Sequence, residues 1–288
     1  MVDFDFINHL VCPKCKSAIT ISAERLVCLN EKCGKKYLIR DGIPVMLVGG
    51  GDLLSEDSGY YPKVKGGTME DNTDPEFSKY DTKVRTHYLR KYISNESRVG
   101  RVLDLCCSKA PFMPYLRSWG YSNNVFGVDL LFEQLVIARN RGVKVVQGNA
   151  LTIPFPTSHF SIVIFTDALV HLVKVEDQYA VFQEVSRVLE RNGCLIMTVA
   201  SLGFAALKAI TSDIDYLKSD YCTFFSLKEV KQLADNDFVM ENFDAFGFYP
   251  FVPGSTRNAK FSFLLDRILN NPVTRKFGMV YYLKLRKR

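Results

Sequence analysis

The sequence predicts an α/β fold built on a doubly wound, mostly parallel sheet of seven strands, preceded by a small metal-binding domain. Short apolar runs typical of buried parallel strands, such as residues 102–105 and 125–128, alternate with segments of helical periodicity. The first run ends in small residues, and Pro111 follows where a helix can begin. Such a strand–turn–helix corner is where open α/β sheets bind nucleotides. Four clustered cysteines near the N-terminus predict the metal-binding domain.

Composition limits the class of protein. Of the 288 residues, 47% are hydrophobic and 24% charged, which is typical of a globular protein with a real core. No apolar run reaches about 18 residues, so we expect no membrane span. The N-terminal residues are acidic and do not resemble a signal peptide, and eight cysteines without such a signal favour the reducing cytoplasm.

The positive charge is unevenly placed. Nine lysines and arginines against one aspartate give residues 257–288 a charge of +8, so the rest of the chain sums to −2. Two interpretations stay open at this point. The basic segment is either a solvated tail or a contact for nucleic acid or an anionic substrate.

The cysteine pairs Cys12–Cys15 and Cys28–Cys33 have spacings of C-x2-C and C-x4-C, with twelve residues between them. Each pair can lie on a turn that directs two thiolates at one ion, and four thiolates complete a tetrahedral structural Zn²⁺ site. A segment this short has little core, so metal binding would supply much of its folding free energy. We therefore divide the chain into a zinc ribbon at 1–48, a linker at 49–75 and a second domain at 76–288.

The second domain is expected to alternate helices and strands. A helix begins at Asp74-Pro75, where apolar residues recur every three or four positions up to Tyr92, and Ser226 with Glu229 forms a capping box that opens a later helix. The remaining expected elements are a helix at 131–141, a strand at 143–147, a strand within 158–165, a helix at 175–190, a turn at 191–193, and strands at 194–199, 238–240 and 280–283.

Residues 102–110 read Val-Leu-Asp-Leu-Cys-Cys-Ser-Lys-Ala. They resemble the first motif of class I S-adenosylmethionine (SAM)-dependent methyltransferases, whose common form is Val-Leu-Asp-Leu-Gly-Cys-Gly-Thr-Gly. Cys106, Ser108 and Ala110 stand where that family has glycines. Glycine permits positive φ and a close approach of the backbone to the ligand. The loop therefore either keeps the family's backbone path at some strain or relaxes and narrows the pocket.

The likeness continues through 143–172, where Gly148-Asn149-Ala150 stands in place of the family's Gly-Asp-Ala. It implies a Rossmann-like sheet that holds SAM across its carboxyl edge, with Asp104 near the methionine amine, Asp129 on the ribose and Asn149 on the adenine amino group. The cofactor-binding residues that the resemblance implies are Asp104, Cys106, Ser108, Asp129, Leu130, Asn149, Ala150 and Thr166.

Asp167 and His171 follow the fourth strand and are the candidate catalytic bases for an acceptor that carries a proton. The N-terminal segment is similar to the zinc ribbon of the activator subunit shared by tRNA, rRNA and protein methyltransferases. We therefore expect a SAM-dependent methyltransferase whose acceptor is a small molecule or RNA. The alternatives are a non-catalytic relative that binds SAM weakly and a zinc-ribbon adaptor. The oligomeric state is left open.

Overall fold

The structure is a computed structural model of the whole chain. It describes residues 4–48, 75–121, 124–211, 223–248 and 259–288. The linker expected at 49–75 therefore lies outside the described residues except for Pro75, where helix α3 begins. The division of the chain at residues 48 and 75 accordingly stays a prediction.

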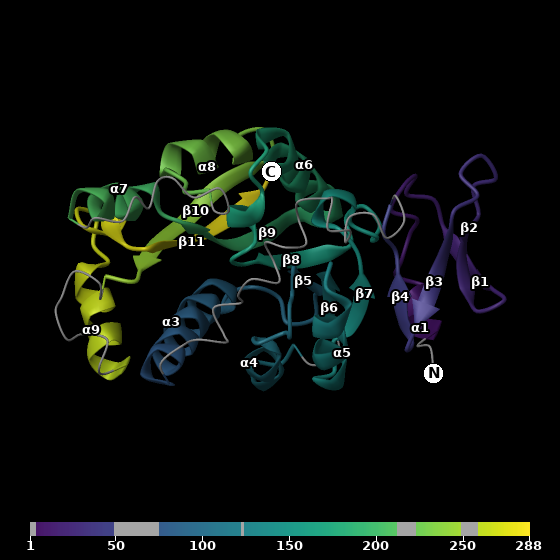
Figure 1. Cartoon of the computed structure of the whole chain (residues 1–288), viewed down its shortest axis with the longest axis horizontal. Helices are drawn as coiled ribbons and strands as arrows, with labels where there is room; N and C mark the ends of the chain where they lie inside the picture. Colours follow the sequence, from purple (N-terminus) through teal and green to yellow (C-terminus); the bar gives the residue numbers. More distant parts are fainter. Residues whose placement is uncertain (1–3, 49–74, 122–123, 212–222, 249–258) are drawn as a thin grey trace.

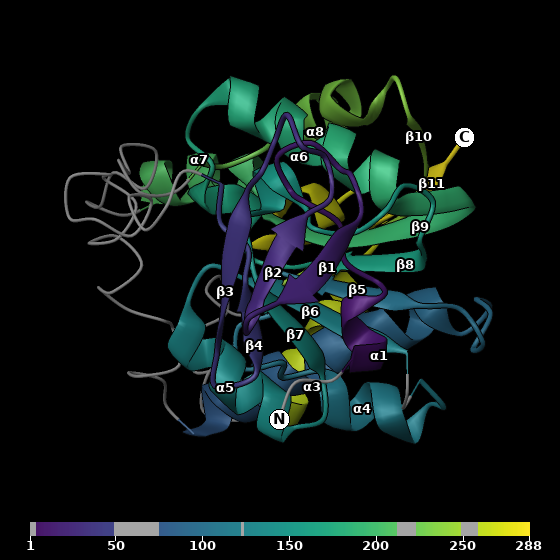
Figure 2. The same ribbon diagram turned by 90° about the vertical axis from the view of Figure 1, so that its right-hand side faces the viewer.

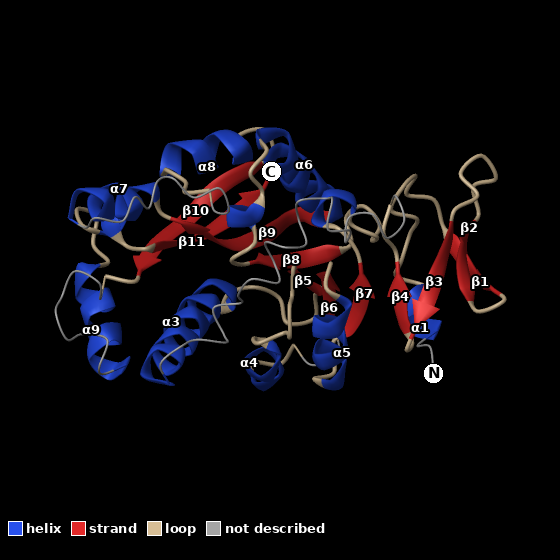
Figure 3. Cartoon of the chain, in the orientation of Figure 1, coloured by secondary structure: helices blue, strands red, loops and turns tan. Residues whose placement is uncertain are grey.

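The described strands form one eleven-stranded sheet that runs the length of the molecule (Figures 1 and 3). Its order is β1-β2-β3-β4-β7-β6-β5-β8-β9-β11-β10. The strands are β1 Ile19–Ser22, β2 Arg25–Cys28, β3 Lys36–Arg40, β4 Ile43–Val45, β5 Val102–Leu105, β6 Val125–Asp129, β7 Lys144–Gln147, β8 Phe160–Phe165, β9 Leu189–Ala200, β10 Phe238–Phe246 and β11 Val280–Lys287.

The last seven strands form the predicted doubly wound sheet. Strands β7, β6, β5, β8 and β9 are parallel, β11 pairs antiparallel with β9, and β10 pairs antiparallel with β11. The strand order reverses direction between β5 and β8, which is the switch point where open α/β sheets place their ligands.

The prediction of seven strands was wrong for the sheet as a whole because the ribbon strands continue it. Strand β4 pairs in parallel with β7, with Val45 opposite Gln147. The backbone N–H of Met46 donates to the Gln147 carbonyl at 2.8 Å. Viewed from the end of the molecule, the ribbon strands stand in front of the parallel sheet (Figure 2).

Helices cover both faces of the sheet. Helices α3, α4 and α5 lie on one face, and α6 and α8 lie on the other (Figure 1). The helices are α1 Phe4–Ile7, α3 Pro75–Ile93, α4 Met113–Ser118, α5 Phe132–Asn140, α6 Val175–Val188, α7 Leu202–Thr211, α8 Leu227–Ala234 and α9 Ala259–Leu269, with short 3-10 turns η3 Ala150–Thr152, η4 Leu169–His171 and η7 Arg275–Phe277. No described helix is long and apolar enough to cross a membrane.

Strand β5 shows how the two faces are built. Its four residues are all buried, and successive side chains point to opposite faces. Leu103 packs in the cluster that includes Val185 of α6, and Val102 packs in the cluster that includes Leu135 of α5. This burial on both faces explains why the strand reads as a continuous apolar run.

Two expected boundaries differ from the structure. The helix expected to end at residue 190 ends at Val188, and β9 begins at once with Leu189. The turn expected at 191–193 lies inside β9, where Asn192 has a φ of 62° and the register against β8 shifts. A turn-forming sequence is thus absorbed as an irregularity within the strand. The capping box of α8 is confirmed, since the Ser226 and Glu229 side chains each bond to the other's backbone N–H.

Candidate functional site

The loop after β5 keeps a backbone that normally needs glycine. The φ angles of Cys106, Ser108 and Ala110 are 59°, 46° and 52°, so all three residues are left-handed. These are the three positions where the resemblance implied glycine. L-residues other than glycine pay roughly 1–2 kcal/mol for this conformation. The loop has therefore not relaxed, and it holds its path at the expense of local strain.

Asp104 places a carboxyl group under this loop. The residue is 3% exposed, and no described residue donates a hydrogen bond to its side chain. Burial and the nearby Asp129 raise the pKa of Asp104 well above its ordinary value. A buried carboxyl group without a partner is costly unless a ligand compensates it. A bound cation at this point would provide that compensation.

Asp129 ends β6 and faces the loop from the side. Its Oδ2 accepts the backbone N–H of Ser108 at 2.8 Å, and its Oδ1 accepts that of Leu131 at 2.9 Å. Burial raises its pKa, although these hydrogen bonds oppose the rise. A carboxylate has about four lone-pair sites, so Asp129 retains acceptor capacity for hydroxyl groups. Leu130 follows it half-buried, and its carbonyl accepts the Gln147 amide at 2.7 Å.

The other predicted cofactor residues lie at the carboxyl ends of the next strands. Asn149 follows β7 and is half-buried, and its Oδ1 accepts the backbone N–H of Leu151 at 2.9 Å. That bond caps the turn that begins at the buried Ala150. Thr166 follows β8 directly and is half-buried. Since parallel strands end at one edge, the fold gathers these residues with Asp104 and Asp129.

The predicted base Asp167 is held in an ion pair. Its carboxylate binds the guanidinium of Arg85 from α3, and Arg85 Nε also binds Asp81 Oδ2 at 2.7 Å. The hydroxyl of the buried Thr198 donates to Asp167 Oδ1 at 3.1 Å and accepts the Asp167 backbone N–H at 2.9 Å. Burial alone would lower the pKa of Arg85, but the charges and hydrogen bonds of Asp167 and Asp81 have the larger effect and raise it.

These contacts orient Asp167. They also bring α3 over the end of β8. Arg85, Asp81 and Thr198 were not among the residues selected from the sequence. The one available signal was the four-residue spacing of Asp81 and Arg85, which places an acid and a base on the same helix face.

His171 is not brought onto Asp167. It ends the turn η4 with an exposed side chain, and the described partners of Asp167 are Arg85 and Thr198. A further residue that the sequence did not indicate is Tyr282 of β11. Its hydroxyl is fully buried and has no hydrogen-bond partner among the described residues. Burial raises the pKa of Tyr282, and the charges of Arg85, Asp167 and Asp104 also act on it. An unsatisfied donor therefore lies close to the predicted cleft.

The four predicted metal ligands come together. The sulfur atoms of Cys12, Cys15, Cys28 and Cys33 all lie within 4.8 Å of one another. The Cys12–Cys33 and Cys15–Cys28 Sγ distances are 3.7 and 3.4 Å. A tetrahedral Zn²⁺ with Zn–S bonds of about 2.3 Å separates its sulfurs by about 3.8 Å, so the cluster fits a structural zinc ion.

The ribbon contacts the loop that carries Asn149. Lys16 Nζ binds Glu184 of α6 at 2.8 Å and donates to the Ile153 carbonyl at 3.3 Å. The backbone N–H of Val11 donates to the Pro154 carbonyl at 3.0 Å. These contacts connect the metal centre to the predicted adenine loop.

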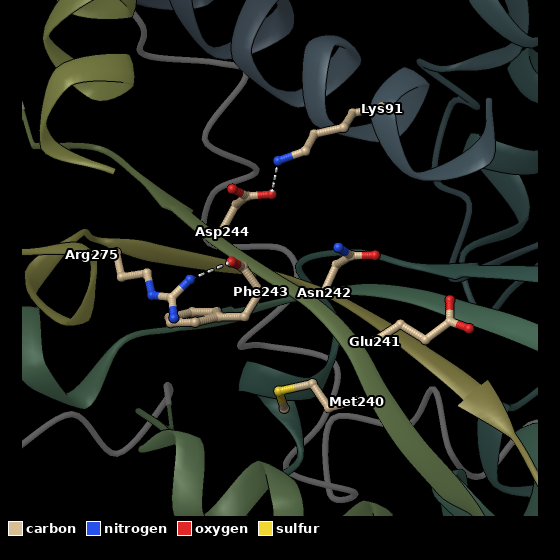
Figure 4. A pocket seen from close by; sticks show the side chains of 7 residues that line it. All are labelled: Lys91, Met240, Glu241, Asn242, Phe243, Asp244 and Arg275. Carbon is tan, nitrogen blue, oxygen red and sulfur yellow. Dashed lines mark hydrogen bonds and ion pairs between the residues drawn. The ribbon is translucent and has the colours of Figure 1, made fainter. Parts of the chain in front are cut away.

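A separate surface pocket of about 390 Å³ lies along β10 (Figure 4). It is lined by Lys91, Met240, Glu241, Asn242, Phe243, Asp244 and Arg275. The Lys91–Asp244 ion pair, at 2.6 Å, already occupies its polar side. None of the predicted site residues lines this pocket, so it is not the predicted cleft.

The residues at the carboxyl edge fit SAM. The uncompensated Asp104 suits its ammonium group, the remaining acceptor sites of Asp129 suit ribose hydroxyls, and the left-handed loop allows the backbone to approach the ligand. The strand order and these three features together are those expected of a site for a nucleotide cofactor.

Known proteins share this architecture. A methyltransferase-domain family model matches residues 102–193. The crystal structure of a protein from Pyrococcus horikoshii aligns with a TM-score of 0.54 at 22% identity, covering 75% of this chain and 93% of that one. A SAM-dependent methyltransferase from Thermotoga maritima aligns with a TM-score of 0.50 at 18% identity, covering 74% and 95%. The chain carries a methyltransferase domain with the fold of SAM-dependent methyltransferases.

Relatives in sequence fall into two groups. A demethylmenaquinone methyltransferase from Geobacillus kaustophilus is 33% identical over 110 residues, which are 35% of this chain and 46% of that protein. The chain spans about half the length of the two demethylmenaquinone methyltransferases that it matches. A UPF0434 protein from Pseudomonas savastanoi is 38% identical over 56 residues, which are 19% of this chain and 92% of that protein. Over that segment the chain belongs to the UPF0434 family, and this match supports the zinc ribbon.

Proposed function

We propose that the protein transfers the methyl group of SAM to a small organic acceptor, and that its ribbon binds a structural Zn²⁺. The observation that carries the proposal is the left-handed backbone at Cys106, Ser108 and Ala110. Strained backbone residues cluster at functional sites, so three of them in this loop support cofactor binding. The cytoplasmic location expected from the sequence is part of this proposal.

The proposed roles are those that the family resemblance implies, and the positions of the residues support them. SAM supplies an electrophilic methyl group on a sulfonium, which an acceptor lone pair attacks in line as the carbon–sulfur bond breaks. Asp104 would bind the ammonium group of the cofactor, Asp129 would accept hydrogen bonds from its ribose hydroxyls, and Asn149 would accept one from its adenine amino group. Leu130 would pack on the adenine ring. The protein's main contributions are positioning and the exclusion of water.

The relatives in sequence support a small acceptor over RNA. Helix α3 reaches the end of β8 through the Arg85–Asp167 ion pair. The similarity to demethylmenaquinone methyltransferases supports a quinone-like acceptor. Asp167 and His171 remain the proposed proton acceptors, with Asp167 oriented by Arg85 and Thr198.

The test combines binding and transfer. Calorimetry should show saturable SAM binding by the wild type, and label from methyl-labelled SAM should pass to a reduced, demethylated naphthoquinone but not to total RNA. Asp129→Ala should weaken binding by about 1–3 kcal/mol, the range for a hydrogen bond to a charged group. Glu176→Ala, at an exposed position on α6, is the matched control. Label in the RNA would refute the acceptor class, and a folded, zinc-loaded protein without SAM binding would refute the activity.

A further inference from the structure

Helix α9 is fixed to the body of the protein by its inward face. Asp266 is fully buried, and its Oδ1 accepts the backbone N–H groups of Gly247 and Phe248 at 3.0 Å each. Its Oδ2 accepts the hydroxyl of Tyr80 from α3. Burial raises the pKa of Asp266 to about 6. The helix therefore has a defined inward face, and the side chains on its other face are held outward.

The outward side chains are apolar. Phe261, Leu264 and Ile268 are 47%, 52% and 62% exposed, and their spacing places them on one side of the helix. The chain after the helix adds the exposed Val273 and Phe277. We call these five side chains, together with the neighbouring Arg267 and Lys276, the α9 face. So many exposed apolar side chains within seventeen residues indicate a contact surface.

The charge of the α9 face has one sign. Arg267 and Lys276 are exposed, while Asp266, the one acid between residues 259 and 288, is buried. Arg267 has no hydrogen bond or ion pair with a described residue, and Lys276 Nζ lies 5.0 Å from the Phe277 ring centre. The α9 face is therefore apolar and basic.

The basic residues near the C-terminus behave differently. Lys284 and Arg286 both bind Glu96, at 2.6 Å in each case, and Lys287 donates to the carbonyls of Ser186 and Leu189. These cations belong to the fold. Arg267 and Lys276 of the α9 face, in contrast, bind no acidic side chain among the described residues, and the face lies at the end of the molecule opposite the zinc ribbon (Figure 1).

We propose that the α9 face binds the surface of an anionic lipid bilayer. An interfacial helix buries aromatic and aliphatic side chains at the headgroup boundary while lysines and arginines contact anionic headgroups. A second copy of the chain would bring like charges together, and a nucleic acid would leave the aliphatic side chains in water. The anionic bilayer satisfies both properties of the face at once. The proposal does not depend on the identity of the methyl acceptor.

The test is sedimentation of the full-length protein with phosphatidylcholine vesicles that contain or lack phosphatidylglycerol. The wild type should bind only the anionic vesicles, and added salt should weaken binding because it screens the charges. Arg267→Glu with Lys276→Glu should lower binding at least about 25-fold, since each basic group near an anionic surface contributes roughly fivefold. Leu264→Gln with Ile268→Gln should lower it by a similar factor.

Matched controls are Lys228→Glu on α8 and Val99→Gln, which change an exposed lysine and an exposed valine elsewhere and should leave binding unchanged. Thermal unfolding establishes that each variant is folded. Absence of binding to anionic vesicles by the wild type would overturn the proposal, as would full binding by the Leu264/Ile268 variant. A wild-type dimer in ultracentrifugation that this variant converts to monomer would also overturn it, in favour of self-association.

Discussion

Replacing Cys106, Ser108 and Ala110 together by glycine should make the protein more stable. Each residue is left-handed, and relieving that conformation returns about 1–2 kcal/mol per position. Each glycine also adds conformational freedom to the unfolded chain, which costs about 0.5 kcal/mol. Ala110 is buried, so losing its methyl group costs about 0.8 kcal/mol more.

The net gain is about 1–4 kcal/mol, which in a protein of this size raises the Tm by about 2–4 °C for each kcal/mol. The assay is urea and thermal unfolding of wild type and triple variant, with calorimetric SAM titration of both. SAM affinity should stay similar or rise modestly. Cys107→Gly is the matched control, because Cys107 is buried but not left-handed. It should lose about 1–3 kcal/mol of stability. A triple variant less stable than the wild type would refute the strain argument, and SAM binding by the variant alone would show that the wild-type loop is degenerate.

The pKa of Asp104 is raised by burial, so without ligand the folded state becomes less stable relative to the unfolded chain as pH rises from the ordinary aspartate value toward the raised one. Asp104→Asn should remove this loss and stabilise the SAM-free protein by about 1–3 kcal/mol in neutral solution, as measured by unfolding. The affinity of the wild type for SAM should rise with pH over the same range, because the ionised Asp104 attracts the ammonium group, and calorimetry should show that the variant lacks this rise. Cys33→Ser should lose bound zinc by metal analysis and unfold the ribbon, while Cys194→Ser, outside the cluster, should retain the metal; wild-type protein that is reduced and metal-free yet folded would contradict the zinc assignment. Arg85→Gln should lower the free energy of unfolding by about 1–3 kcal/mol, which is less than for a fully buried ion pair because the Asp167 side chain is half-exposed. It should lower the rate of methyl transfer more than the affinity for SAM, and an unchanged rate would show that Asp167 needs no such orientation.

Sequence reasoning located the parts of the fold that depend on local pattern. The strand at 102–105 and the capping box at Ser226 were predicted where they occur, because burial on both faces and helix capping leave direct signals in the residues. The four cysteines were found for the same reason, since their spacing reflects the geometry of the metal site.

The parts that depend on distant pairing could not be predicted. The continuation of the sheet from β4 to β7 rests on Val45 meeting Gln147, which are about a hundred positions apart. The contact of Arg85 with Asp167 has the same origin. The backbone conformation of the loop at 106–110 could not be predicted because small side chains permit both a strained and a relaxed backbone. Only the surrounding structure, including the bond from Ser108 to Asp129, fixes the choice.

The junction of β4 with β7 has a consequence for how the protein can be divided. Without the ribbon, β7 would present an open edge of unpaired N–H and C=O groups, and Phe126 and Phe155 would lose their contact with Phe6 of α1. Open edges of buried, apolar strands promote pairing between molecules. A chain that lacks residues 1–48 should therefore aggregate rather than yield a smaller enzyme, and a chelator that removes zinc from the full-length chain should have the same effect. The ribbon thus covers the edge of β7, and loss of zinc from the ribbon would expose that edge.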